Sequence, residues 1–88
     1  MMINEIVNLN GNVTLKDASG VDVVVAYLST NLDASTENFN INMNVTNKVL
    51  LDTTSAVNVA GESAEVQYSQ FETAVKAKAK ELGYAIFA

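Results

Sequence analysis

The sequence predicts an α+β domain: an antiparallel β-meander of three to four long strands, one C-terminal amphipathic helix packed on one sheet face, and a short final strand. In residues 38–47 apolar and polar side chains alternate, which is the period of a strand with one buried face. In residues 62–82 apolar side chains recur at intervals of three and four, which is the period of a helix with one buried face. A chain of 88 residues is long enough for one hydrophobic core. We therefore expect residues 1–88 to form a single domain.

The first predicted strand lies within residues 1–16. One parity carries the apolar residues Ile3, Val7, Leu9, Val13 and Leu15, and asparagine, threonine or lysine occupies most of the other, so the alternation continues across Gly11. This continuity favours one long strand that is bent or bulged at the glycine. The alternative is a tight hairpin at Asn10-Gly11, a dipeptide typical of two-residue turns.

A turn and a buried strand follow. Asp17 accepts hydrogen bonds through its side chain and Gly20 tolerates a positive φ, so residues 16–21 predict a turn. The next strand, residues 21–29, is apolar on both parities from Val23 to Leu28, which is typical of a strand that is covered on both sides or central in its sheet. The polar residues 30–38 then predict a loop.

A third strand is predicted to begin at residue 39. It either continues to residue 51 or is interrupted by a tight turn at Asn47-Lys48 that leads into a short fourth strand. Because one helix covers only one sheet face, we expect the apolar parity of this strand to pack against the helix. The apolar residues are Phe39, Ile41, Met43 and Val45, and the expected helix partners are Tyr68, Phe71 and Val75.

The helix is predicted over residues 62–82. Glutamates near its N-terminus and lysines near its C-terminus complement the helix dipole. Gly83 stands where a left-handed cap ends a helix, and the apolar residues 84–88 predict the final strand. The apolar stripe consists of Ala64, Tyr68, Phe71, Val75, Ala79 and Leu82.

Composition excludes several functions. The net charge of -5, with five lysines and no arginine, argues against nucleic-acid binding. Without histidine or cysteine the chain has no hydrolytic triad, no thiol nucleophile and no metal site built from these residues. Its carboxylates and glycines lack the spacing of calcium loops and phosphate loops. We therefore predict a protein that is not an enzyme and has no catalytic residues, cofactor or metal.

The sequence also gives expectations about location and origin. The N-terminus has no basic segment followed by an apolar run, and no stretch reaches the about 20 apolar residues of a membrane span. We therefore expect a cytoplasmic protein that binds no membrane. The absence of Arg, Pro, His, Cys and Trp beside abundant asparagine indicates AT-rich coding, which fits a low-GC bacterium or one of its phages or prophages.

The candidate functional surface is the sheet face that the helix leaves bare. Asparagines on this face donate and accept hydrogen bonds without carrying charge, and the strands contain no proline and few lysines to protect their edges. The apolar residues at 24, 26 and 28 are expected on the same face, as a patch for a second subunit. The candidate interface residues are Val24, Ala26, Leu28, Asn40, Asn42 and Asn44.

We accordingly predict a structural or protein-interaction module that self-associates through its β-sheet into a homo-oligomer. A more ordinary interpretation is that the asparagines fill solvent-facing positions without a partner. Another alternative is a small acidic inhibitor or adaptor that binds a basic host protein, because opposite charges accelerate encounter in a salt-dependent way.

Overall fold

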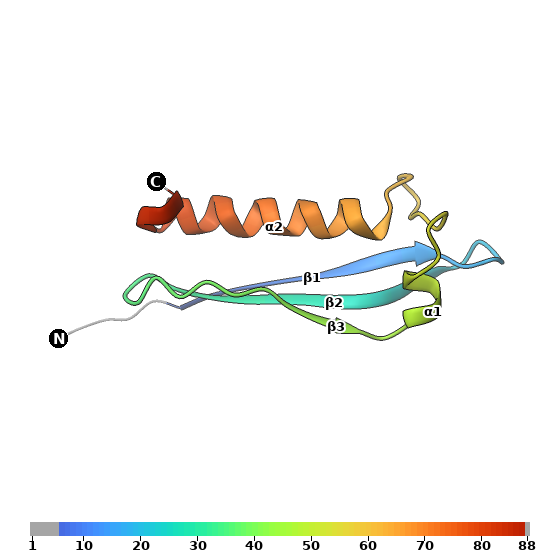
Figure 1. The fold of residues 1–88 in the computed structure, drawn as a ribbon, viewed down its shortest axis with the longest axis horizontal. Helices are drawn as coiled ribbons and strands as arrows, with labels where there is room; N and C mark the ends of the chain where they lie inside the picture. The colour runs from blue at the N-terminus through green and yellow to red at the C-terminus, as the bar shows by residue number, and fades with distance from the viewer. Residues whose placement is uncertain (1–5, 88) are drawn as a thin grey trace.

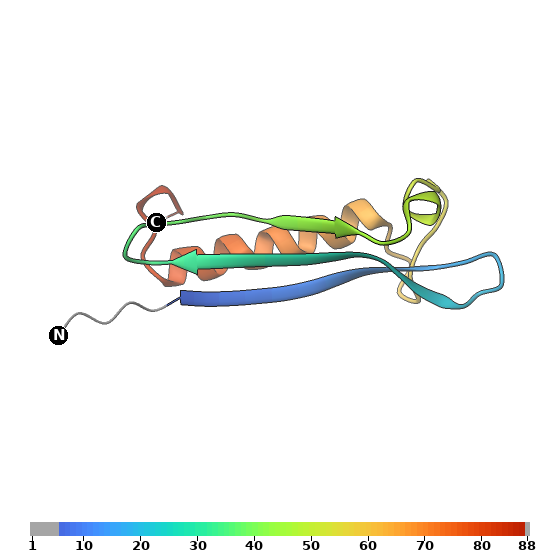
Figure 2. The same cartoon turned by 90° about the horizontal axis from the view of Figure 1, so that it is seen from below.

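The computed structural model describes residues 6–87, which form an elongated structure of two layers (Figures 1 and 2). One layer is a three-stranded antiparallel sheet with strand order β1-β2-β3, and the other is a long helix on one face of it. This confirms the predicted α+β class. The elements are β1 (Ile6–Lys16), β2 (Asp22–Asp33), β3 (Asn42–Val45), α1 (Lys48–Leu51), α2 (Ala64–Glu81) and the 3-10 helix η1 (Ala85–Phe87).

Strand β1 runs without interruption across Gly11, which confirms the long strand and excludes the hairpin. The bend or bulge expected at the glycine is wrong, because Gly11 pairs regularly with Leu28. The glycine is needed for packing instead. A Cβ atom at this position would lie 3.0 Å from the ring of Phe71, a tight contact that the ring or the helix would have to shift to relieve. The predicted start of the strand at Ile3 lies outside the described residues.

The turn between β1 and β2 is confirmed. The Asp17 carboxylate accepts hydrogen bonds from the backbone N–H groups of Ser19 (2.8 Å) and Val21 (3.0 Å). Gly20 has a φ of 78°, which lies in the left-handed region that glycine adopts without strain. Both residues therefore have the role that the sequence predicts.

Strand β2 contains a β-bulge. Val13 pairs with Ala26 and Thr14 with Val24, so Val25 is an extra residue opposite β1. The bulge shifts the parity of the strand, and both Val25 and Ala26 are fully buried. The predicted loop at residues 30–38 begins too early, because β2 continues to residue 33 and the connection is a turn over residues 34–37.

The bulge corrects part of the predicted interface. Ala26 and Leu28 were expected on the bare face of the sheet, but they are 0% and 2% exposed and belong to the core beneath α2. Beyond the bulge, even-numbered residues of β2 face the helix. Thr30 and Leu32 continue this buried row.

The third strand is shorter than predicted, and the turn at Asn47-Lys48 leads into a helix rather than a fourth strand. The Asn47 side chain accepts a hydrogen bond from the Leu50 N–H at 3.0 Å and so caps the short helix α1. Asparagine at the cap and the adjacent apolar residues 49–51 favour this helical turn over an extended chain.

Only some of the apolar residues between positions 39 and 45 pack against the core beneath the helix. Phe39 and Ile41 pack against the cluster around Val75, as predicted. Met43 and Val45 remain 53% and 39% exposed, so their predicted packing is wrong. Helix α2 contacts mainly β1 and β2, and the outer strand β3 therefore lies beyond its cover.

Helix α2 lies within the predicted range. The Ser63 hydroxyl accepts a hydrogen bond from the Val66 N–H at its start, and Gly83, with a φ of 91°, follows its end. The predicted final strand is wrong for residues 84–87, because Tyr84 is irregular and residues 85–87 form η1, while Ala88 lies outside the described residues. Tyr84 anchors this segment because its side chain is buried and its hydroxyl donates to the Asn38 carbonyl.

Candidate functional site

The sheet face opposite α2 carries three rows of neighbouring polar side chains, which we call the asparagine face. In antiparallel strands, residues directly opposite each other point to the same side. The register of the three strands therefore places together side chains that lie far apart in the sequence. The rows are Asn12-Tyr27-Asn44, Asn10-Ser29-Asn42 and Asn8-Asn31.

Tyr27 stands at the centre of this face. It lies on the middle strand, is 51% exposed, and has an asparagine on each neighbouring strand. Amide groups donate and accept hydrogen bonds, and a tyrosine ring adds apolar area with a polar tip. The face can therefore contact a partner through hydrogen bonds and ring packing.

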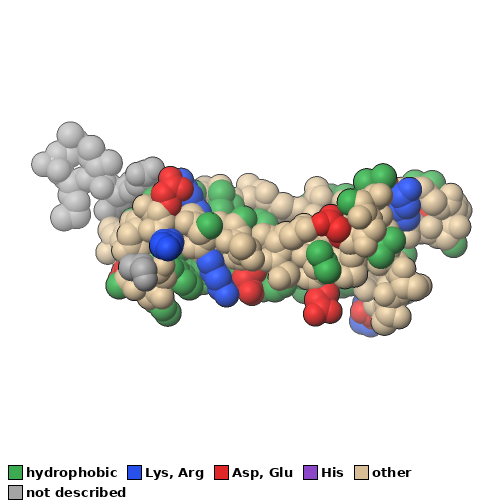
Figure 3. All heavy atoms as spheres, turned by 90° about the horizontal axis from the view of Figure 1, so that it is seen from above, with side chains coloured by type: hydrophobic (Ala, Val, Ile, Leu, Met, Phe, Trp, Pro, Cys, Tyr) green, Lys and Arg blue, Asp and Glu red, His purple; other side chains and the backbone are tan. Residues whose placement is uncertain are grey.

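The centre of the asparagine face is uncharged. The charged residues of the same parity stand at its ends, where Lys16 pairs with Asp22 and Ile6 with Asp33. The opposite side of the molecule differs, because acidic and basic side chains lie along the helix-covered face (Figure 3). A partner that contacts the central rows therefore meets no charge that it must neutralise.

The structure brings only half of the predicted interface residues onto the exposed part of this face. Asn42 and Asn44 are exposed there, and the half-buried Val24 is beside Thr14 at one end. Asn40 is partly buried, because its side-chain oxygen accepts a hydrogen bond from the Asn31 N–H at 3.1 Å. Ala26 and Leu28 lie in the core, as described above.

Sequence reasoning missed Tyr27. Tyr27 has the same parity as Val23 and Val25. In a strand without a bulge its side chain would therefore point toward the helix. The bulge at Val25 moves it to the opposite face. A run that is apolar on both parities contains no period from which a bulge could be located.

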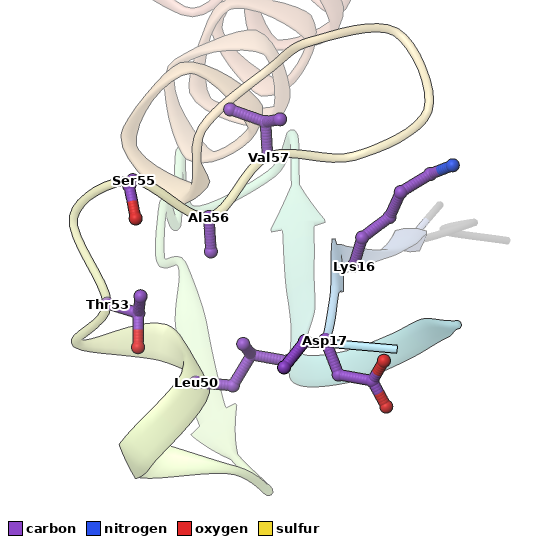
Figure 4. Close-up of a pocket in the computed structure, with 8 residues that line it drawn as sticks. Lys16, Asp17, Leu50, Thr53, Ser55, Ala56 and Val57 are labelled. Carbon is purple, nitrogen blue, oxygen red and sulfur yellow. The ribbon is translucent and has the colours of Figure 1, made fainter. Parts of the chain in front are cut away.

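A surface pocket of about 420 Å³ lies at the end of the sheet near α1. The side chains of Lys16 and Asp17 point away from it (Figure 4). The Asp17 carboxylate is already bonded to the turn described above. The remaining residues of its wall are apolar or hydroxyl-bearing: Ala18, Leu50, Thr53, Ser55, Ala56 and Val57. This pocket contains no arrangement of an acid, a base and a nucleophile.

Titratable groups with shifted pKa values have structural explanations. Hydrogen bonds from Asn58 and Gln70 hold the pKa of Glu62 below its usual value, in a loop that leads into α2. The hydrogen bond and charge of Asp52 raise the pKa of Lys48. Neither group lies on the asparagine face or in the pocket.

Residues 6–87 contain no group of three or more acidic, histidine or cysteine side chains close enough together to hold a metal ion. Within the same part of the chain, no helix combines the length and the apolar character that crossing a membrane requires. The chain matches no protein-family model, no curated protein and no solved structure.

Proposed function

We propose that this protein is a non-enzymatic structural module that self-associates through its β-sheet. The observation that supports this most directly is the asparagine face, an uncharged hydrogen-bonding surface with the exposed ring of Tyr27 at its centre. Tyrosine is enriched in protein interfaces, and charged residues are depleted at their cores. The surface therefore has the chemical character of an interface core.

Two observations favour a protein partner over other occupants. The groups with shifted pKa values lie in a loop (Glu62), a short helix (Lys48) and the core (Tyr84), so they do not suggest a reaction site. The central rows also carry no negative charge that could attract a basic host protein, which argues against the acidic-adaptor alternative on this face. A surface of the same neutral character, such as a second copy, fits it better.

Analytical ultracentrifugation over a range of concentrations tests the proposal. We expect the wild-type chain to form oligomers at high micromolar concentration, and we expect Tyr27→Ser with Asn44→Asp to weaken them, because the pair removes the ring and adds repelling charges. Val49→Ser is the matched control, since it removes an apolar side chain that is 83% exposed on α1, away from the asparagine face. A wild-type chain that stays monomeric at these concentrations would overturn the proposal.

A further inference from the structure

The outer edge of β1 is closed over its last residues by the chain itself. At Thr14, the side chain of Gln67 accepts a hydrogen bond from the backbone N–H (2.9 Å) and donates one to the carbonyl (2.8 Å). At Lys16, the backbone N–H donates to the carbonyl of Val57 (2.9 Å). These side-chain and loop groups occupy the place of a neighbouring strand.

The rest of this edge is open. Backbone groups of a strand in an antiparallel ladder point alternately to its two sides. Because those of Thr14 and Lys16 point outward, so do those of the residues at the same parity: Ile6, Asn8, Asn10 and Asn12. Between residues 6 and 87 no hydrogen bond joins these outward groups to another part of the chain. Figure 2 shows β1 at the border of the sheet.

The open edge itself carries none of the charges that normally prevent edge pairing. Residues 6–15 contain no charged residue and no proline. On α2, Gln67 marks the flank above the edge, and Ala74, Lys78 and Glu81 share this flank. The two charged side chains of this flank, Lys78 and Glu81, form an ion pair with each other at 3.3 Å. The charged residues of the middle of the helix, Glu65, Glu72 and Lys76, occupy the other flank.

We infer that this open edge pairs with the same edge of a second copy of the chain, antiparallel and around a two-fold axis at Leu9. This register places Ile6 opposite Asn12 of the second copy and Asn8 opposite Asn10 of the second copy. Every open backbone group then gains a partner, because each such pair exchanges two hydrogen bonds. The inference rests on the proposed self-association and adds to the asparagine face a second contact between the copies, at the β1 edge.

The pairing joins the two sheets into one and extends the asparagine face across both copies. Opposed residues in this register have the same parity, so Asn8 meets Asn10 and Ile6 meets Asn12 on one side, and Leu9 meets Leu9 of the second copy on the other. A two-fold contact of this kind is closed, since each copy uses its edge once. The remaining edges belong to β3, which has four residues and is therefore a short template for further growth.

Two variants test the contact. Asn10→Pro removes an outward N–H while leaving the inward bonds to β2, as a proline on an edge strand does. We expect about tenfold or more weaker dimerisation, because each copy loses one interface hydrogen bond of about 1 kcal/mol and tenfold corresponds to 1.4 kcal/mol. Asn10→Thr keeps the N–H and is the matched control.

Leu9→Cys gives an independent readout, since the natural chain has no cysteine. Residues opposite each other at a non-hydrogen-bonded position are about 4.5 Å apart between Cα atoms, within the range of a disulfide. We expect rapid oxidation of Leu9→Cys to a covalent dimer and little of it for Val49→Cys, an 83% exposed position on α1 outside the asparagine face. This pattern would support the inference even if Asn10→Pro failed to fold.

The outcomes separate the inference from the proposed function. Oligomers that are insensitive to Asn10→Pro and that do not cross-link through Leu9→Cys would overturn the edge contact, while self-association through the asparagine face would stand. A monomeric wild-type chain would overturn both. Loss of oligomers in folded Asn10→Pro together with selective cross-linking of Leu9→Cys would support the contact.

Discussion

The two faces of the sheet differ in how far their side chains are buried, although the same three strands form both. Facing α2, burial depends on the position of the helix: Leu28 is 2% exposed, whereas Met43, its register partner on the neighbouring strand, is 53% exposed. On the asparagine face no part of residues 6–87 forms a second layer (Figure 1), and in its three rows every side chain except that of the half-buried Ser29 is exposed. Cover by the helix, and not hydrophobicity alone, decides which residues stabilise the fold.

The largest expected difference between these regions is that between Leu28→Ala and Met43→Ala. Leu28→Ala leaves a cavity in the core and should lower the free energy of unfolding by about 2–5 kcal/mol. Met43→Ala, at a paired position on the same face, should change it by only about 0.5 kcal/mol. Urea denaturation of both variants measures the difference. Equal losses would show that something covers β3 in solution.

Gly11→Val is expected to have the next largest effect. The added Cβ would lie 3.0 Å from the ring of Phe71, so the helix must shift or the ring must rotate. Overpacking of this kind costs about 1–3 kcal/mol. The double variant with Phe71→Leu should recover part of the loss, which a double-mutant cycle quantifies. No recovery would mean that the glycine serves the strand backbone rather than the helix contact.

Gln67→Ala should follow, with a loss of about 1–3 kcal/mol, because the N–H and carbonyl of Thr14 lose their partner at the closed part of the β1 edge. Hydrogen exchange at the Thr14 amide should accelerate more than at Val13, which is bonded to β2. Ser69→Ala, at an exposed position two residues further along α2, is the control and should leave both amides unchanged. Equal acceleration at Thr14 and Val13 would indicate general destabilisation instead.

The residues that followed one clear period were predictable from the sequence. Alternation across Gly11 predicts β1, and the apolar stripe from Ala64 to Leu82 predicts α2. The bulge at Val25 was not predictable, because a run of six apolar residues contains no polar position to mark the shift of parity. Ala26, Leu28 and Tyr27 were consequently assigned to the wrong faces.

The ends of two elements were predicted wrongly for a different reason. Asn47 reads as a turn residue in a strand pattern, but its side chain caps a helix once the chain reverses there. Residues 84–87 have the composition of a strand, yet Tyr84 is buried beside Leu32 and Val75, and residues 85–87 form a 3-10 helix. Tertiary contacts decide both cases, and no local pattern encodes them.

A smaller effect is expected at alkaline pH. Burial, with added repulsion from Asp33 and Glu37, raises the pKa of Tyr84 above its ordinary value of 10.0. The unfolded chain therefore loses this proton first, so the stabilisation is fully present below pH 10 and disappears as the pH rises through the folded-state pKa. Tyr84→Phe should show a shallower loss of stability above pH 10 than the wild type. Parallel curves would assign the loss to other groups.

The smallest effect on folding is expected on the asparagine face. Tyr27→Ser removes a half-exposed ring that lies on the side without a helix, so the free energy of unfolding of the monomer should change by only about 0.5 kcal/mol. Thermal unfolding at low concentration measures this change in the stability of the monomer. The same experiment at high concentration also includes the stabilisation that a bound second copy contributes. A large loss at low concentration would mean that Tyr27 supports the fold itself. If stability is lost only at high concentration, the helix-covered face stabilises the chain and the asparagine face binds the second copy.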